Sequence, residues 1–252
     1  ATEYPIRRSN HAMEKKRTKI AYFTAVGVFL VLLVVLGLTY RETPLPTLEV
    51  EGEPVLAHTL RAIDAATLVD EIILATRTEC LAEMAELCQK CSLQKPVRVV
   101  VGGETRTHSV LAAALEANEK ARLIAVHDGA RPLIRPEQID ELIRFGERTY
   151  AAAPAVPVSD TIKRTEPSTG RVLETPDRAA LFAVQTPQAE LLKAALQSAV
   201  NAEVTLTDDC SAVERLGKEV YLTAGDPENI KITRPLDLRL AEAILAERRK
   251  QA

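Results

Sequence analysis

Short apolar runs alternate with amphipathic stretches along the middle of this chain. The apolar runs are rich in Val, Ile and Leu, which predicts buried strands. The stretches between them repeat their apolar positions every three to four residues, which predicts helices that pack on a sheet. The predicted strands are 69–76, 97–101 and 122–127, and the predicted helices are 54–66, 79–91, 107–118 and 136–149. This alternation favours an α/β fold with a mostly parallel sheet and helices on both faces.

The pattern changes after residue 150. Residues 151–164 are extended and contain two prolines, 166–170 carry a turn signal, and 171–175 resume a strand. These features predict a protruding hairpin, or arm, at about 157–178. An isolated hairpin is at best marginally stable, so we expect the arm to pack on another surface, such as a second subunit. Beyond it, the predicted helices are 190–199, 210–216 and 235–250, and the predicted strands are 219–223 and 229–233.

The N-terminal region has a different pattern. Residues 1–19 are an extension that ends in a basic flank, and residues 20–40 carry no charge. About 20 apolar residues are enough to cross a bilayer as a helix, and a basic flank stays on the cytoplasmic side. The length of 20–40 favours a transmembrane-type helix that attaches the protein to a membrane. The alternative is an unusually long hydrophobic first strand of the sheet.

Composition narrows the classes of function. The formal net charge is −3, both signs are spread along the chain, and aromatic residues make up only 4%. Neither a basic face nor a set of stacking aromatic residues for a nucleic acid is therefore expected. The four cysteines do not suggest a disulfide framework. A small anionic substrate would have to be bound by local clusters of Lys and Arg.

Candidate catalytic residues lie where the strand 122–127 ends. Asp128 follows this strand directly, and Arg131 comes three residues later. In an open α/β sheet, ligands bind beyond the carboxyl ends of the strands, so both residues are well placed for chemistry. In the predicted strand 229–233, the period of two places Lys231 on the polar face, where it is suited to neutralise a phosphate.

Several such motifs occur together and in a fixed order. They are GGETRTHSV (102–110), VHDGARP (126–132), PVSDTIKR (157–164), TPDR (175–178), TPQ (186–188), LTDDCSAVE (206–214) and GDPENIKITRPLDL (225–238). Over about residues 47–252, this series resembles the 2-C-methyl-D-erythritol 4-phosphate cytidylyltransferase family. The resemblance implies a Rossmann-like nucleotidyltransferase domain that forms a homodimer through the arm. It also implies a cytoplasmic enzyme of isoprenoid precursor biosynthesis, which joins CTP to a sugar-alcohol phosphate and releases pyrophosphate.

The resemblance implies roles for individual residues as well. Asp128 would position Mg²⁺ and the reacting groups, and Lys231 would contact the phosphates at the reacting centre. The residues expected at CTP are Gly103, Glu104, Arg106 and Ser109, and those expected around the methylerythritol phosphate are Arg131, Thr161, Arg178 and Thr207. Phosphoryl-type transfer depends on positioning and charge neutralisation, so Mg²⁺, Lys and Arg suit it without a protein nucleophile.

One motif of the family is missing from this chain. Counted back without gaps from residues 54–60, the family's glycine-rich loop, AAGxGxRM, falls near 34–38, where the chain reads VVLGL. The lysine of the family's Pro-Lys-Gln segment falls on Leu45. Bulky side chains keep a backbone away from a phosphate, and loss of one preorganised donor can cost about 10²–10³ in rate. We therefore expect the triphosphate half of the site to be absent and the activity to be impaired.

Two alternatives to this function stay open. The first is a ribitol-5-phosphate cytidylyltransferase, which a panel of sugar-alcohol phosphates distinguishes. The second is a membrane-tethered, catalytically inactive relative that keeps the dimer, which membrane fractionation and CTP-binding measurements distinguish.

Overall fold

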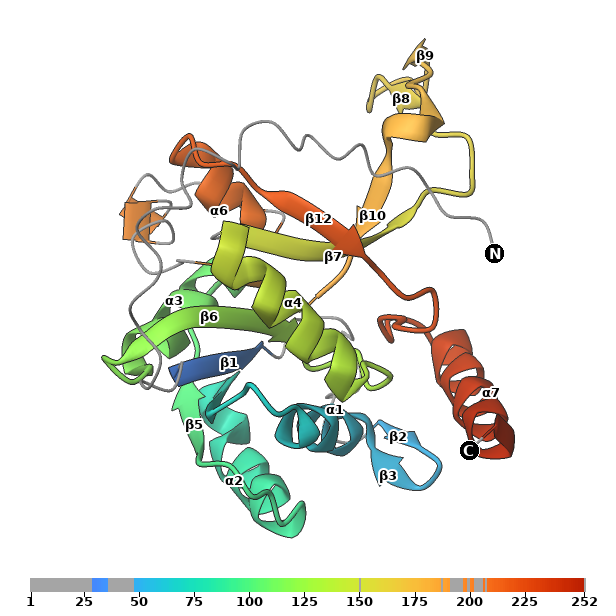
Figure 1. The fold of residues 1–252 in the computed structure, drawn as a ribbon. Coiled ribbons are helices and arrows are strands. Elements are labelled where there is room, and N and C mark those ends of the chain that lie inside the picture. Colours follow the sequence, from blue (N-terminus) through green and yellow to red (C-terminus); the bar gives the residue numbers. More distant parts are fainter. Residues whose placement is uncertain are drawn as a thin grey trace.

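A twisted eight-stranded sheet forms the centre of the molecule (Figure 1). The computed structural model describes residues 29–35, 48–149, 151–186, 188–190, 197–198, 200–201, 206 and 208–251. The strand order is β10-β7-β11-β6-β1-β4-β5, and β12 also pairs with β7. The strands of this sheet are β1 (Phe29–Val35), β4 (Glu71–Thr76), β5 (Val97–Val101), β6 (Ala121–Asp128), β7 (Ala151–Pro157), β10 (Phe182–Val184), β11 (Gln188–Glu190) and β12 (Tyr221–Ala224).

Half of the sheet is parallel, as the alternation of strands and helices predicts. The strands β6, β1, β4 and β5 run parallel to one another, whereas β10 and β11 are antiparallel to their neighbours. Every residue of β4 is buried, and so are the last six residues of β6. Burial on both faces is why these strands are continuous apolar runs rather than alternating ones.

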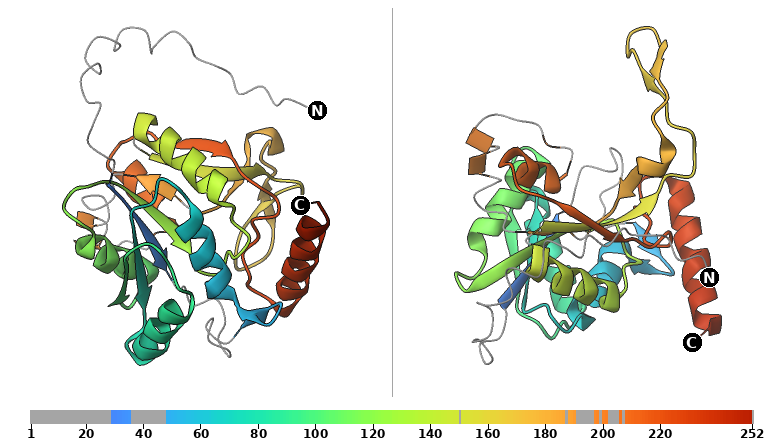
Figure 2. Two further views of the ribbon diagram at one scale, coloured as in Figure 1. Left: turned by 60° about the horizontal axis from the view of Figure 1, so that its bottom comes forward. Right: turned by 45° about the horizontal axis from the view of Figure 1, so that its top comes forward.

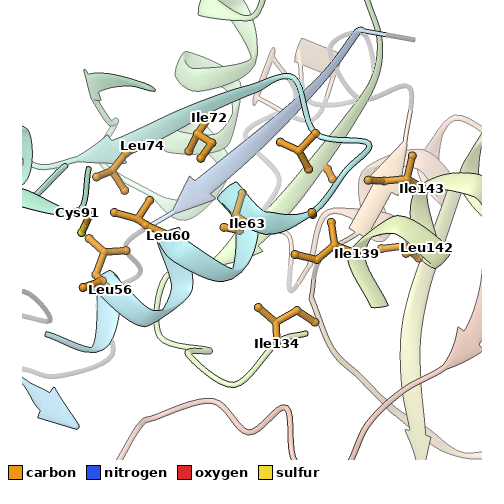
Figure 3. Close-up of a cluster of buried hydrophobic side chains, with 14 of the residues drawn as sticks. Leu56, Leu60, Ile63, Ile72, Leu74, Cys91, Ile134, Ile139, Leu142 and Ile143 are labelled. Atoms are coloured by element: carbon orange, nitrogen blue, oxygen red, sulfur yellow. The ribbon is translucent and has the colours of Figure 1, made fainter. Parts of the chain in front are cut away.

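Helices cover both faces of the sheet. On one face, Leu56, Leu60 and Ile63 of the first helix pack with Ile72 and Leu74 of β4 (Figure 3). Helices α2 (Leu81–Lys90) and α4 (Pro136–Thr149) join this cluster, and α3 (Arg106–Glu116) and α6 (Cys210–Arg215) contribute to a separate cluster. The helices are α1 (Val55–Ala65), α2 (Leu81–Lys90), α3 (Arg106–Glu116), α4 (Pro136–Thr149), α6 (Cys210–Arg215) and α7 (Pro235–Gln251).

Strand β1 corrects the prediction of a transmembrane-type helix over 20–40. Val31–Val35 pair in parallel with β4 on one side, and Phe29–Val35 pair in parallel with β6 on the other. A strand that lies between two parallel neighbours is buried and can be as continuously aliphatic as a membrane helix. The length of the apolar run therefore does not distinguish the two, and the prediction that relied on it was wrong. The alternative, a hydrophobic first strand, is confirmed for these seven residues. The rest of 20–40 and the extension 1–19 lie outside the described residues.

Among the helices that the structure describes, none combines the length and the apolar character that crossing a membrane requires.

Two short predictions are also wrong. Residues 229–233 form no strand; they are an irregular segment anchored by a hydrogen bond from the Ile232 amide to the Ala130 carbonyl, 2.8 Å long. A period of two over only five residues is too weak to separate a strand from an extended loop. Residue 190, the predicted start of a helix, instead ends β11, which pairs with β6 and β7.

The predicted arm is present as a two-stranded hairpin. Strands β8 (Arg164–Thr165) and β9 (Val172–Glu174) pair with each other and project from the body of the molecule (Figures 1 and 2). Gly170 lies between them with φ +70°, a left-handed conformation that suits glycine. A smaller hairpin, β2 (Glu49–Val50) with β3 (Glu53–Pro54), precedes α1.

Candidate functional site

Asp128, the last residue of β6, is surrounded by three cationic side chains. Its Oδ2 atom lies 3.0 Å from Lys231 Nζ and 3.5 Å from Arg131 Nε. Its Oδ1 atom lies 3.6 Å from Arg106 Nη2. The cations come from three places: the start of α3, the turn after β6, and the irregular segment before α7. The carboxyl end of a central strand therefore carries a dense cluster of charge.

The cations keep Asp128 ionised although the carboxylate is largely buried. Burial raises the pKa of Asp128, but the charges of Lys231, Arg106 and Arg131 outweigh burial and lower this pKa below its ordinary value. The surplus of positive charge around one carboxylate suits phosphate groups more than neutral ligands.

Asp209, at the start of α6, fixes the orientation of Arg106. Its two carboxylate oxygens accept hydrogen bonds from Arg106 Nη1 and Nη2, 2.8 and 2.7 Å long, and the Asp209 side chain is only 1% exposed. Burial alone would lower the pKa of Arg106, but Asp209 and Asp128 outweigh it and raise this pKa. The bidentate pair therefore presents a permanently charged guanidinium to Asp128.

The sequence alone does not single out Asp209, which stands next to Asp208 in the motif 206–214, directly before the predicted helix 210–216, where either acid could cap the helix. Asp208 alone fills that role by accepting a hydrogen bond from the Ser211 amide, 3.1 Å long. Because Asp208 already caps the helix, the second acid, Asp209, is the signal that could have pointed to a contact elsewhere, here with Arg106.

The loop between β5 and α3 holds the residues expected at CTP. A Cβ atom on Gly103 would lie 2.3 Å from His108 Cβ, so only glycine fits there. The Ser109 hydroxyl accepts a hydrogen bond from the Gly103 amide, 3.1 Å long, and lies 2.9 Å from the Thr105 carbonyl, to which it can donate. Glu104 is exposed on the same loop. The structure thus brings these residues together with Arg106 in one compact turn.

Lys231 is held beside the cluster by its own segment. Arg131 Nη1 donates to the Asn229 carbonyl at 2.8 Å, and Asn229 Nδ2 donates to the Thr186 carbonyl at 3.0 Å. Asn229 is 1% exposed. These hydrogen bonds tie the segment that carries Lys231 to the turn that carries Arg131. The alternation of side chains in a predicted strand suggested that Lys231 is suited to neutralise a phosphate. The segment that positions Lys231, however, is irregular and is not a strand.

Strand β1 leaves the sheet next to the cluster. In its pairing with β6, Val34 lies opposite His127 and Val35 opposite Asp128. Strand β1 therefore ends at the position that pairs with Asp128. The sequence predicts that the glycine-rich loop of the family falls near 34–38, where the chain reads VVLGL. Residues 36–38 lie outside the described residues, so the absence of that loop stays a prediction.

Two predicted site residues lie apart from the cluster in the described part of the chain, and a third lies outside that part. Thr161 and Arg178 are exposed near the base of the arm, where Arg178 donates to the Ser159 carbonyl. Within the described part of the chain, no hydrogen bond or ion pair links either of them to Asp128. Thr207 lies outside the described residues.

Asp128 fits a site for a divalent cation in which the protein supplies one carboxylate. In the part of the chain that the structure describes, no three His, Cys, Asp or Glu residues gather as a metal site. Mg²⁺, however, often binds one or two carboxylates together with substrate phosphates and water. Among the described residues, the one cation in contact with Asp128 Oδ1 is Arg106, at 3.6 Å, so this oxygen is the one suited to such a role.

Comparisons with known proteins show the family to which this chain belongs. The family described as 2-C-methyl-D-erythritol 4-phosphate cytidylyltransferase matches residues 39–247. A protein of that name from Halalkalibacterium halodurans is 41% identical over 207 residues, which are 81% of this chain and 90% of that protein. One from Bacillus velezensis is 43% identical over 202 residues, or 79% of this chain and 86% of that protein.

Solved structures show the same similarity. The 4-diphosphocytidyl-2C-methyl-D-erythritol synthase of Anaerococcus prevotii superposes with a TM-score of 0.79 and 28% identity, over 87% of this chain and 97% of that one. The enzyme of Thermus thermophilus gives a TM-score of 0.67 and 28% identity, over 87% and 98% of the two chains. Family, relatives and fold agree, and this chain belongs to the 2-C-methyl-D-erythritol 4-phosphate cytidylyltransferase family.

Proposed function

We propose that this chain transfers the cytidylyl group of CTP to 2-C-methyl-D-erythritol 4-phosphate and releases pyrophosphate. The observation that carries the proposal is the cluster of Lys231, Arg131 and Arg106 around Asp128 at the carboxyl end of β6. An oxygen of the substrate phosphate attacks the α-phosphorus of CTP, and the bond to the leaving pyrophosphate breaks. Charge accumulates on phosphate oxygens in this reaction, so fixed cations are the groups that lower its barrier.

Each residue of the cluster has a separate task in this proposal. Lys231, whose Nζ atom is a compact charge, neutralises the α-phosphate. Arg131 binds the incoming sugar-alcohol phosphate, and Arg106, held by Asp209, stays aligned beside the nucleotide. Asp128 orients these cations. Its carboxylate would also hold Mg²⁺, which would supply further charge neutralisation.

The loop of Gly103, Glu104 and Ser109 receives the cytidine of CTP. Gly103 keeps this turn tight, and the Ser109 hydroxyl fixes its shape through the 3.1 Å hydrogen bond from the Gly103 amide. A tight glycine turn at the carboxyl end of a strand lets a ligand approach the backbone closely.

A homodimer through the arm is part of the proposal. Apolar side chains on the arm are strongly exposed: Val172 is 53%, Leu173 43% and Ile162 39% exposed. A second copy that covers them would bury this surface and carry Thr161 and Arg178 to the phosphate site of its partner. Light scattering on the purified chain tests the dimer, and a monomer at micromolar concentration would contradict it.

Pyrophosphate release is the direct test of the activity. The purified chain is incubated with CTP, Mg²⁺ and 2-C-methyl-D-erythritol 4-phosphate, and ribitol 5-phosphate is the competing substrate. We expect slow release with the methylerythritol phosphate, because the chain has VVLGL where the family has its glycine-rich loop.

A variant that restores the loop sharpens this test. Val34→Gly, Leu36→Gly, Leu38→Arg and Leu45→Lys together should raise the rate by about 10²-fold or more, since one preorganised donor is worth that much. The matched control adds Lys231→Gln to the same variant and should lose the gain. If neither the chain nor the restored variant releases pyrophosphate above background, the proposed function is wrong.

A further inference from the structure

A buried chain of polar groups links the two ends of the turn after β6. The Asp128 amide donates a hydrogen bond to Thr186 Oγ1, 3.0 Å long. Thr186 Oγ1 lies 3.2 Å from Nδ1 of His127, and Nε2 of the same ring lies 3.3 Å from the Arg131 carbonyl oxygen. The His127 side chain is 0% exposed and Thr186 is 5% exposed. Neither residue has a task in the proposed reaction.

The partners determine the direction of each hydrogen bond. A carbonyl oxygen only accepts, so Nε2 of His127 carries the hydrogen and donates to Arg131. The ring is completely buried, which favours its neutral form with a single N–H, so Nδ1 is left as an acceptor. Thr186 Oγ1 therefore donates its hydrogen to His127 Nδ1 and accepts the hydrogen bond from the Asp128 amide. With these directions, each polar group in this network has a hydrogen-bond partner.

We propose that His127 and Thr186 are positioning residues, which hold the backbone at both ends of the turn so that the Asp128 carboxylate and the Arg131 guanidinium face Lys231. The expected effect of this positioning on the reaction rate rests on the proposed function. We call His127 and Thr186 the turn clamp.

The turn clamp also reaches the segment that carries Lys231. The Thr186 carbonyl accepts the hydrogen bond from Asn229 Nδ2, 3.0 Å long, and Asn229 in turn accepts from Arg131 through its own carbonyl. Thr186 therefore contacts the Asp128 turn through its side chain and the Lys231 segment through its backbone. A residue that links both segments sets the distance between the carboxylate and the ammonium.

The substitution Thr186→Val tests the clamp with little change of shape. Valine leaves the Asp128 amide and His127 Nδ1 without their hydroxyl partner, whereas Thr186→Ser keeps the hydroxyl and is the matched control. Misplacement by about 1 Å can cost 10²-fold in rate, so we expect kcat of Thr186→Val to fall by about 10–10²-fold, with KM changed less. Thr186→Ser should restore most of the rate. A purely structural role would lower the free energy of unfolding without a selective loss of kcat.

Two NMR measurements test the clamp without any turnover. Long-range ¹⁵N spectra report which ring nitrogen of His127 carries hydrogen, and we expect the Nε2–H tautomer. The signal is assigned by its loss in His127→Asn or by elimination with the other three histidines. Amide exchange of Asp128 should become about tenfold faster in Thr186→Val than in Thr186→Ser, because one hydrogen bond is lost.

The outcomes separate the clamp from the proposed function. An Nδ1–H tautomer, or equal Asp128 exchange in the two Thr186 variants, would overturn the clamp. Equal kcat in the two variants would overturn its catalytic consequence. Absence of turnover in the wild-type chain and in the restored-loop variant would refute the proposed function, while the tautomer and exchange data would still decide the clamp.

Discussion

Replacing Asp209 with asparagine should reveal how strongly the cluster depends on the buried partner that orients Arg106. The change removes the charge that makes two hydrogen bonds to Arg106, 2.8 and 2.7 Å long, at a position that is 1% exposed. Removing one partner of a buried pair typically costs about 3–5 kcal/mol. Arg106 keeps 27% exposure of its side chain, and asparagine retains one acceptor, so we expect a loss of about 2–3 kcal/mol in the free energy of unfolding.

A double-mutant cycle isolates the contribution of the pair. Urea unfolding is followed by far-UV circular dichroism, because the chain contains no tryptophan. The cycle compares Asp209→Asn, Arg106→Met and the double variant, and we expect the double variant to lose about 2 kcal/mol less than the sum of the single losses. Asp208→Asn is the matched control, because it removes the same charge from the neighbouring residue and should cost less than about 1 kcal/mol. Additive single effects, or equal losses for the two aspartates, would refute the reasoning.

Three further predictions concern Lys231, Asp128 and Asp140. Lys231→Gln should lower kcat by about 10²–10³ with little change in KM for CTP in the pyrophosphate assay, whereas a loss confined to KM would contradict its role at the reacting phosphate. The lowered pKa of Asp128 adds stability to the folded state that is complete above the unfolded pKa of about 3.9 and is lost as the pH falls below this value and through the lower folded pKa. Asp128→Asn should therefore flatten the unfolding free energy in that pH range, and an unchanged slope would be evidence against the ion cluster. Asp140→Ala should cost about 2–4 kcal/mol in urea unfolding, since Asp140 accepts hydrogen bonds from the Thr67 amide and hydroxyl and from the Leu68 amide, 3.1, 2.6 and 2.9 Å long. Asp140→Asn is its control and should lose less.

Much of the candidate site could be recognised from residue order. Asp128 and Arg131 follow a buried strand, and ligands in α/β folds collect at such ends, so their placement needed no tertiary information. Lys231 was found for a partly wrong reason, because its segment is irregular and is held by hydrogen bonds rather than by strand pairing. The pair of Arg106 and Asp209 joins residues 103 positions apart, and no local pattern reports such a contact.

By itself, the sequence determined the α/β alternation, the strands β4, β5 and β6, of which β4 and most of β6 are buried, the arm and the family motifs. These features are local: they depend on periodicity, turn residues and residue order, and each can be read within a short window. Only the tertiary structure decided that Phe29–Val35 form a strand, because the same aliphatic run suits a membrane helix until β4 and β6 supply partners for its backbone. It alone decided which cations surround Asp128, since a buried carboxylate selects its partners by distance in space.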